Sequence, residues 1–95
     1  MLKGKLIHKE ESDSGCEKYD FSKVSVICTH GFNNVFGDEA GKISLSALES
    51  IITKYGHSAE YFQVFEYILP DNAKKEFWVI NDDNITVTML LPEEY

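Results

Sequence analysis

The chain has 95 residues, of which 43% are hydrophobic, and sixteen acidic side chains against nine basic ones give it a formal net charge of −7. All nine basic residues are lysine, so the chain lacks the arginine forks that bind phosphates and guanine edges through two hydrogen bonds at once. We therefore expect no direct contact with nucleic acid or with an anionic membrane. The excess of acid instead favours a protein partner that carries a basic surface.

The length fits a single domain over residues 1–95, with enough apolar side chains for one modest core. No stretch approaches the about 18 consecutive apolar residues of a membrane-spanning helix, and residues 1–9 do not resemble a secretion signal. We expect the protein to be cytoplasmic. In that reducing compartment Cys16 and Cys28 are expected to be free thiols, and a bridge between them is the less favoured alternative.

Residues 2–8 and 23–30 predict two short strands, since polar and apolar side chains alternate in the first and β-branched residues dominate the second. The polar and acidic segment between them, residues 10–22, is expected to be a solvated loop. Residues 31–42 hold three glycines without apolar periodicity and predict a long connection.

Residues 44–55 predict a helix that ends at Gly56, the residue type favoured just after a helix. Its apolar residues recur at spacings of three and four, and are Leu45, Leu48, Ile52 and Tyr55. Residues 60–69 fit either a helix or a strand, and their aromatic and β-branched content favours a strand. The stretches 76–81 and 85–91 then predict a hairpin, with Ile85, Val87, Met89 and Leu91 facing inward.

The element order is therefore ββαβββ, an α+β domain with a mainly antiparallel sheet and one helix packed on one face. One helix can cover only one face of a five-stranded sheet. In the stretch 76–81, Phe77 and Val79 point to one face, whereas Trp78 and Ile80 point to the other. Because both faces are apolar there, we expect Trp78 and Ile80 to bind a partner or a second copy of the chain.

The sequence favours a protein without enzymatic activity. Cys28 and His30 lie two residues apart, so on one strand both would point to the same face, but nothing in the sequence nominates a third group to orient the base. A cysteine in the core beside a histidine at a strand end is the favoured interpretation. The potential metal ligands are scattered, and we expect neither a metal nor another cofactor.

The acidic side chains gather in the loop of residues 10–20 and in the hairpin turn, where they predict partner contacts by Glu10, Glu11, Asp13, Glu17, Asp20, Asp82 and Asp83. The alternative, that these acids only keep the domain soluble, stays open. The preferred hypothesis is a small acidic binding or inhibitor protein of phage or mobile-element type. It would dock on the basic, nucleic-acid-binding surface of a restriction, CRISPR or nuclease effector.

Two alternatives come from other classes. One is a homo-oligomeric accessory or structural protein, in which the uncovered sheet face pairs with itself in a homodimer. The other, less favoured, is a cysteine-dependent enzyme that uses Cys28 and His30.

The C-terminal part, with Trp78-Val79-Ile80-Asn81-Asp82-Asp83-Asn84 and Thr88-Met89-Leu90-Leu91-Pro92-Glu93-Glu94-Tyr95, resembles a family of uncharacterised small proteins from low-GC Gram-positive bacteria and their mobile elements. The resemblance lies within residues 78–95. It implies a source for the chain, and no activity comes with it.

Overall fold

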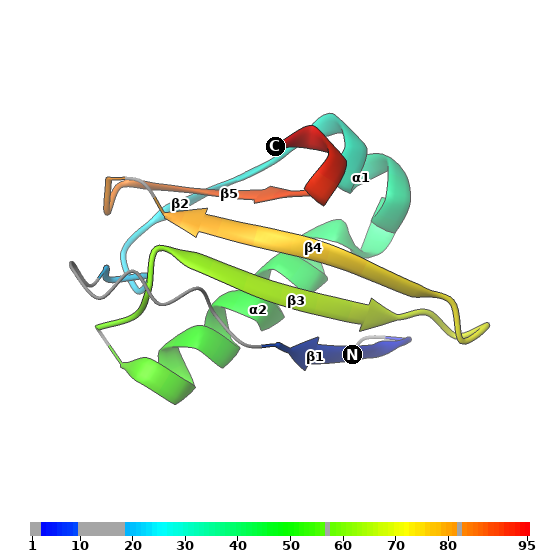
Figure 1. The fold of residues 1–95 in the computed structure, drawn as a ribbon, viewed down its shortest axis with the longest axis horizontal. Helices are drawn as coiled ribbons and strands as arrows, with labels where there is room; N and C mark the ends of the chain where they lie inside the picture. Colours follow the sequence, from blue (N-terminus) through cyan, green and yellow to red (C-terminus); the bar gives the residue numbers. More distant parts are fainter. Residues whose placement is uncertain (1–2, 10–18, 57, 82) are drawn as a thin grey trace.

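A computed structural model describes residues 3–9, 19–56, 58–81 and 83–95, and shows a five-stranded sheet with helices behind it (Figure 1). The elements in chain order are β1 (Lys5–His8), β2 (Ser25–Cys28), α1 (His30–Phe36), the 3-10 turn η1 (Gly37–Glu39), α2 (Ala40–Tyr55), β3 (Phe62–Ile68), β4 (Lys74–Asn81), β5 (Thr86–Leu90) and the 3-10 turn η2 (Pro92–Glu94). This confirms the predicted α+β fold with ββαβββ order, in which α2 is the long helix.

The strands lie side by side in the order β1-β3-β4-β5-β2, so β1 and β2 form the two edges of the sheet. The pairs β1–β3, β3–β4 and β4–β5 are antiparallel, whereas β2 runs parallel to β5. The sheet is thus mainly antiparallel, as predicted, and the single parallel pair places β2 far from β1 although the two are neighbours in sequence.

The core lies between the sheet and the two helices. Alternate residues of the strands point into it, because successive side chains of a strand face opposite sides. In β3 and β4 the central residues on this covered face are fully buried, among them Phe65, Tyr67, Phe77 and Val79, whereas Lys75 near the start of β4 is exposed. The helices close the core with Phe32, Phe36, Ile43, Ala47 and Ile51. The ring of Phe77 stacks on Phe65 at 5.4 Å and meets Phe32 edge-on at 5.2 Å.

The predicted long connection over residues 31–42 is wrong, because this segment forms α1, η1 and the start of α2. The Thr29 hydroxyl accepts a hydrogen bond from Phe32 N at 3.2 Å and so caps α1. Phe32 and Phe36, four residues apart, are both buried. Burial of these two phenylalanines stabilises α1. The glycines in the same segment make this helix difficult to predict from the sequence.

The apolar stripe of α2 also differs from the prediction. Because α2 begins at Ala40, its buried residues are Ala40, Ile43, Ser44, Ala47, Leu48 and Ile51. Leu48 belongs to both stripes, whereas Leu45 is 61% exposed. The helix ends before Gly56, as predicted. The φ of Gly56 is 67°, which suits a residue without a side chain.

The strand assignment of residues 60–69 is confirmed by β3, whose burial alternates along its whole length. The hairpin prediction is confirmed by β4 and β5. The inward position predicted for Ile85 is wrong, because Ile85 lies in the turn before β5 and is 66% exposed. Val87, Met89 and Leu91 are buried as expected.

Candidate functional site

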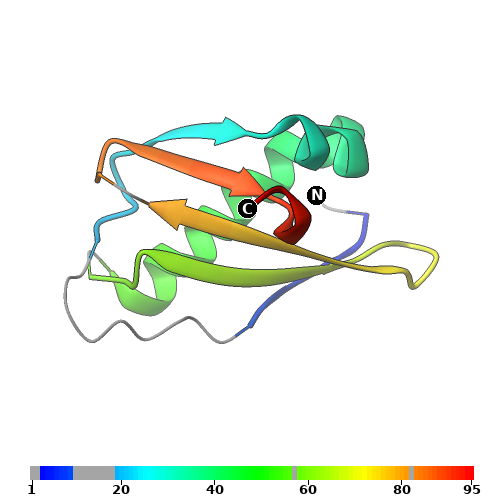
Figure 2. The same ribbon diagram turned by 45° about the horizontal axis from the view of Figure 1, so that its top comes forward.

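One face of the sheet carries no α-helix in the described part of the chain. Figures 1 and 2 show α2 behind the sheet and η2 in front of it, at one end. We call this side the open face; from β1 to β2 it includes Ile7, Phe62, Val64, Glu66, Ile68, Glu76, Trp78, Ile80, Leu90 and Ile27. Trp78 and Ile80 therefore lie on the face opposite Phe77 and Val79, as their alternation predicts.

Three aromatic rings gather on the open face and form what we call the aromatic cluster: Phe62, Trp78 and Tyr95. The ring centroids of Phe62 and Trp78 lie 4.9 Å apart, and those of Trp78 and Tyr95 lie 5.4 Å apart. Tyr95 is 78% exposed, and Phe62 and Trp78 are half-buried. Aromatic rings supply large contact areas in protein interfaces.

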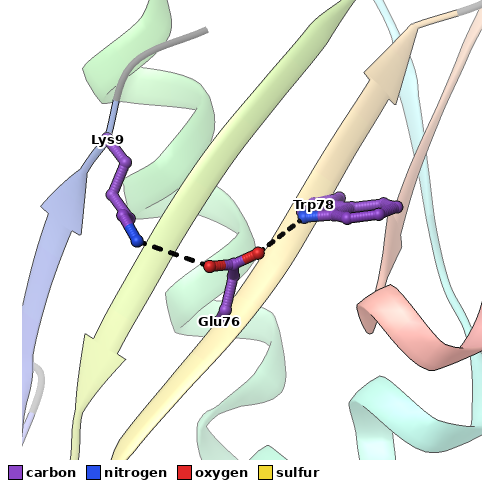
Figure 3. A network of polar contacts seen from close by, with 3 residues as sticks. All are labelled: Lys9, Glu76 and Trp78. Carbon is purple, nitrogen blue, oxygen red and sulfur yellow. Dashed lines mark hydrogen bonds and ion pairs between the residues drawn. The ribbon is translucent and has the colours of Figure 1, made fainter. Parts of the chain in front are cut away.

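The indole of Trp78 is held by a polar contact on the same strand (Figure 3). Its Nε1–H donates to Glu76 Oε2 at 3.0 Å, and Glu76 Oε1 pairs with the Lys9 ammonium at 3.4 Å. The carboxylate of Glu76 thus lies between the indole and a lysine from the β1 side of the sheet. This contact fixes the orientation of the ring in the absence of any partner.

A second carboxylate faces Glu76 across the sheet. Glu66 of β3 and Glu76 of β4 are directly opposite in the register, and both point to the open face. Like charges at directly opposite positions repel each other, and the Lys9 ammonium beside Glu76 offsets part of this repulsion. The sequence analysis did not select either residue, because the register that brings them together is set by the β3–β4 hairpin.

Two of the predicted acidic residues meet at the turn between β4 and β5, which we call the acidic turn. Asp20 N donates to Asn84 Oδ1 at 2.9 Å, and the buried Asn81 Nδ2 donates to the Asp20 carbonyl at 3.1 Å. Asp83 belongs to the same turn, because Asn84 N donates to Asn81 Oδ1 at 2.8 Å. The fold therefore brings the backbone of Asp20 to Asn81 and Asn84, which precede and follow Asp83 in the turn, across more than sixty residues of sequence.

Hydrogen bonds fix both carboxylates of the acidic turn. Asp83 Oδ1 accepts from Thr86 N at 2.8 Å and from Ile85 N at 2.9 Å. These backbone donors, that of Thr86 first, hold the pKa of Asp83 below its usual value. Asp20 Oδ1 accepts from Ser22 N and from the Ser22 hydroxyl. Asp83 is therefore charged throughout the neutral range, in a fixed place.

The C-terminal residues are anchored beside the aromatic cluster by Glu94. Its Oε1 accepts from the Thr29 hydroxyl at 2.6 Å and from Leu91 N at 2.9 Å, while its Oε2 accepts from Gly31 N at 3.0 Å. These donors, Thr29 first, lower the pKa of the Glu94 carboxyl. A Cβ at Gly31 would lie 2.6 Å from Glu94 Cδ, so a side chain there would displace the Glu94 carboxylate from these hydrogen bonds. The sequence analysis did not identify this anchor, which positions Tyr95.

The other predicted contact residues have different outcomes. Ile80 lies on the open face but is only 7% exposed, so it supports the surface more than it offers contact area. Glu10, Glu11, Asp13, Glu17 and Asp82 lie outside the described residues. The undescribed residues carry −4 of the net charge of −7, because they hold five acids and one lysine.

The predicted arrangement of Cys28 and His30 on one strand face is wrong, because β2 ends at Cys28 and His30 begins α1. The Cys28 Sγ instead lies 3.2 Å from the Ser44 Oγ of α2. Cys28 is a free thiol, as expected. Within the described ranges, no group of three or more histidine, cysteine or acidic side chains is placed to hold a metal ion.

No protein-family model matches the sequence, and neither a curated protein nor a solved structure matches it. The resemblance of residues 78–95 stays a prediction. Across the described residues, no helix combines the length and the apolar character needed to cross a membrane.

Proposed function

We propose that the chain is a small, non-enzymatic binding protein that docks through its open face and acidic turn on a basic surface of a partner protein. The partner class is an effector that handles nucleic acid, such as a nuclease, a restriction enzyme or a CRISPR effector. The protein acts in the cytoplasm without a cofactor, and it blocks the effector by covering the surface that its nucleic acid needs. A phage or mobile-element origin fits this role.

The observation that carries the proposal is the aromatic cluster on a face that no α-helix covers in the described part of the chain. Glu66 and the acidic turn lie beside the cluster, and Lys5 and Lys74 lie at the opposite end of this face. Protein interfaces are built from a central group of aromatic or arginine side chains within a polar rim. Here Phe62, Trp78 and Tyr95 supply the centre, and Glu66 supplies a carboxylate next to it. The acidic turn adjoins the end of the same face, because Ile80 pairs with Phe62 just before the strand reaches that turn.

The fixed positions of these carboxylates favour binding. A carboxylate that is already held in place loses little conformational freedom when a partner lysine or arginine approaches it. Asp83 is held by two backbone donors, and Trp78 is held by Glu76. The negative electrostatic field around the acidic turn also speeds encounter with a positively charged surface and suppresses encounter with negatively charged ones.

The proposal is tested by neutralising two charges without removing their hydrogen-bond acceptors. In the Glu66→Gln, Asp83→Asn double variant, the asparagine keeps an oxygen for Ile85 N and Thr86 N. A partner captured from the native host and then purified should bind this variant about tenfold more weakly at 50 mM salt. The nucleic acid that the partner binds should compete with the unaltered protein for the same surface of the partner.

A matched control changes the same number of charges elsewhere, with Glu49→Gln on α2 and Asp71→Asn in the β3–β4 turn, both exposed. The control should bind within about twofold of the unaltered protein. The affinity of the unaltered protein should fall steeply between about 50 and 500 mM salt, because salt screens exposed charges. Equal binding of the two variants, or an affinity insensitive to salt, would rule out the charge mechanism.

The uncovered aromatic cluster also favours a second candidate function, a homo-oligomeric accessory protein that buries this face against a second copy. Trp78 is the only tryptophan, so its fluorescence reports on the open face directly. In a homodimer of this kind, the emission shifts to shorter wavelength with rising protein concentration, in step with a doubling of mass in sedimentation. A monomer at all concentrations removes this candidate.

A further inference from the structure

The two edge strands of the sheet differ in a way that points to a second docking surface. β1 itself contains Lys5; lysines also flank both strands in the chain, Lys3 and Lys9 beside β1 and Lys23 before β2. Lysine on an edge strand discourages other strands from pairing with it. β2, with the sequence SVIC, has no charged residue, and its Val26 and Ile27 are 36% and 52% exposed. By this criterion β2 is the unprotected edge (Figure 2).

The outer side of β2 presents backbone groups to solvent. Ser25 N donates to the Ile85 carbonyl at 2.8 Å and Thr29 N donates to the Met89 carbonyl at 3.0 Å, so these alternate amides face β5. Because successive backbone groups of a strand point to opposite sides, the N–H and C=O groups of Val26 and Cys28 point away from the sheet. The Cys28 carbonyl accepts one long contact of 3.5 Å, from Asn33 Nδ2.

An apolar groove of about 500 Å³ lies along this edge, between β2 and α2. Val26, Cys28 and the strongly exposed Leu45 supply its apolar wall, and Gly41 and Ser44 line it as well. Asp38 and Lys42 also line the groove. The volume suits a few side chains of an extended peptide.

We propose that this edge takes an extended, apolar segment of a partner protein, which adds to the sheet as a sixth strand beside β2. The backbone groups of Val26 and Cys28 would pair with the segment, and alternate side chains of the segment would enter the groove beside Leu45. A second copy of the chain fits less well. A second β2 offers only four residues, so the pair buries far less than the about 1,200 Å² of a stable dimer interface, whereas a weakly bound peptide segment needs no interface of that size.

This surface is separate from the open face, and the inference does not rest on the proposed function. Val26 points to the groove, whereas its neighbour Ile27 points to the open face, opposite Thr88. The two residues therefore form a matched pair for substitution. A lysine at position 26 enters the groove, and a lysine at position 27 does not.

The test uses the full chain, labelled with ¹⁵N, and a capped pentapeptide of alternating valine and threonine as the probe. At millimolar peptide, exchange of the Val26 and Cys28 amides with solvent should slow at least tenfold. A peptide that is N-methylated along the edge meeting β2 should give no protection. A peptide methylated along its outer edge should protect as well as the unmodified one.

The variants supply the remaining controls, after circular dichroism has shown that each is folded. Val26→Lys and, independently, Leu45→Lys should abolish protection, whereas Ile27→Lys should retain it. The proposal is overturned by the absence of protection in the unaltered chain, by equal protection from both methylated peptides, or by loss of protection in Ile27→Lys alone. It is also overturned if the chain dimerises through β2 without peptide.

Discussion

Phe77 and Trp78 are neighbours on β4, yet they belong to opposite faces of the sheet and to different kinds of environment. Phe77 is fully buried among Phe32, Phe36 and Phe65. Trp78 is half-buried, beside an exposed Tyr95 and a half-exposed ion pair. In the described residues, the helices α1 and α2 therefore cover one aromatic face, and no α-helix covers the other. Apolar character alone does not separate the two roles; what separates them is which elements the fold places in front.

The largest expected difference between the faces is in stability. Phe77→Ala should lower the free energy of unfolding by about 3–5 kcal/mol, because it leaves a cavity among packed rings. Guanidinium denaturation followed by circular dichroism measures this loss. Phe77→Leu, which retains most of the volume, should cost less than about 1.5 kcal/mol and shows that the effect comes from the cavity.

Trp78→Ala sharpens the comparison directly. It should lower the free energy of unfolding by only about 1–2 kcal/mol, because the indole is half-buried and lies on the face opposite the helices α1 and α2. Binding to the partner, measured by calorimetry, should nonetheless fall at least tenfold. A stability loss equal to that of Phe77→Ala would mean that both faces serve the fold.

A third prediction concerns the anchor that holds the C-terminal residues near the open face. Gly31→Ala should destabilise the protein by no more than about 1 kcal/mol, because the new methyl group displaces the exposed Glu94 carboxylate from its hydrogen bonds, while alanine favours the helix α1. In a Glu94→Ala background, the same change should cost clearly less. A double-mutant cycle with denaturant measures the coupling between the two positions. Simple additivity of the two changes would show that this contact does not constrain the C-terminus.

The smallest expected effect is on pH dependence. The folded protein lowers the pKa of Glu94 below its ordinary 4.5, mainly through the Thr29 hydroxyl, so its stabilisation is complete above that value. This stabilisation is lost as pH falls through the pKa that Glu94 has in the folded protein. The midpoint temperature of thermal unfolding, measured between pH 6 and pH 3, should therefore fall less steeply in Glu94→Gln than in the unaltered chain. Parallel curves for the two proteins would contradict this assignment.

The sequence was sufficient for features that depend on local alternation. The period of two places Phe65 and Tyr67 on the opposite face of β3 from Val64, and it separates Phe77 from Trp78. The two-stranded hairpin and the glycine that ends α2 follow from turn and cap preferences in the same way. These signals lie within a few residues, so no knowledge of the tertiary fold is needed to read them.

The features that the sequence could not supply depend on register and on tertiary packing. The pairing of Glu66 with Glu76 is fixed by the hairpin register, and the contact of Asp20 with the acidic turn bridges distant segments. The helix α1 depends on the burial of two phenylalanines within a glycine-rich segment. The exposure of Leu45 follows from where α2 begins, and no count of apolar spacing reveals that start.

The most direct test of the open face as the binding surface is an NMR titration of the ¹⁵N-labelled chain with its purified partner at 50 mM salt. The single indole N–H of Trp78 and the amides of Asp83 and Asn84 should shift, while the amides of the middle of α2 should not. Shifts confined to α2 and the covered side of the molecule, with an unchanged Trp78 indole signal, would contradict the account.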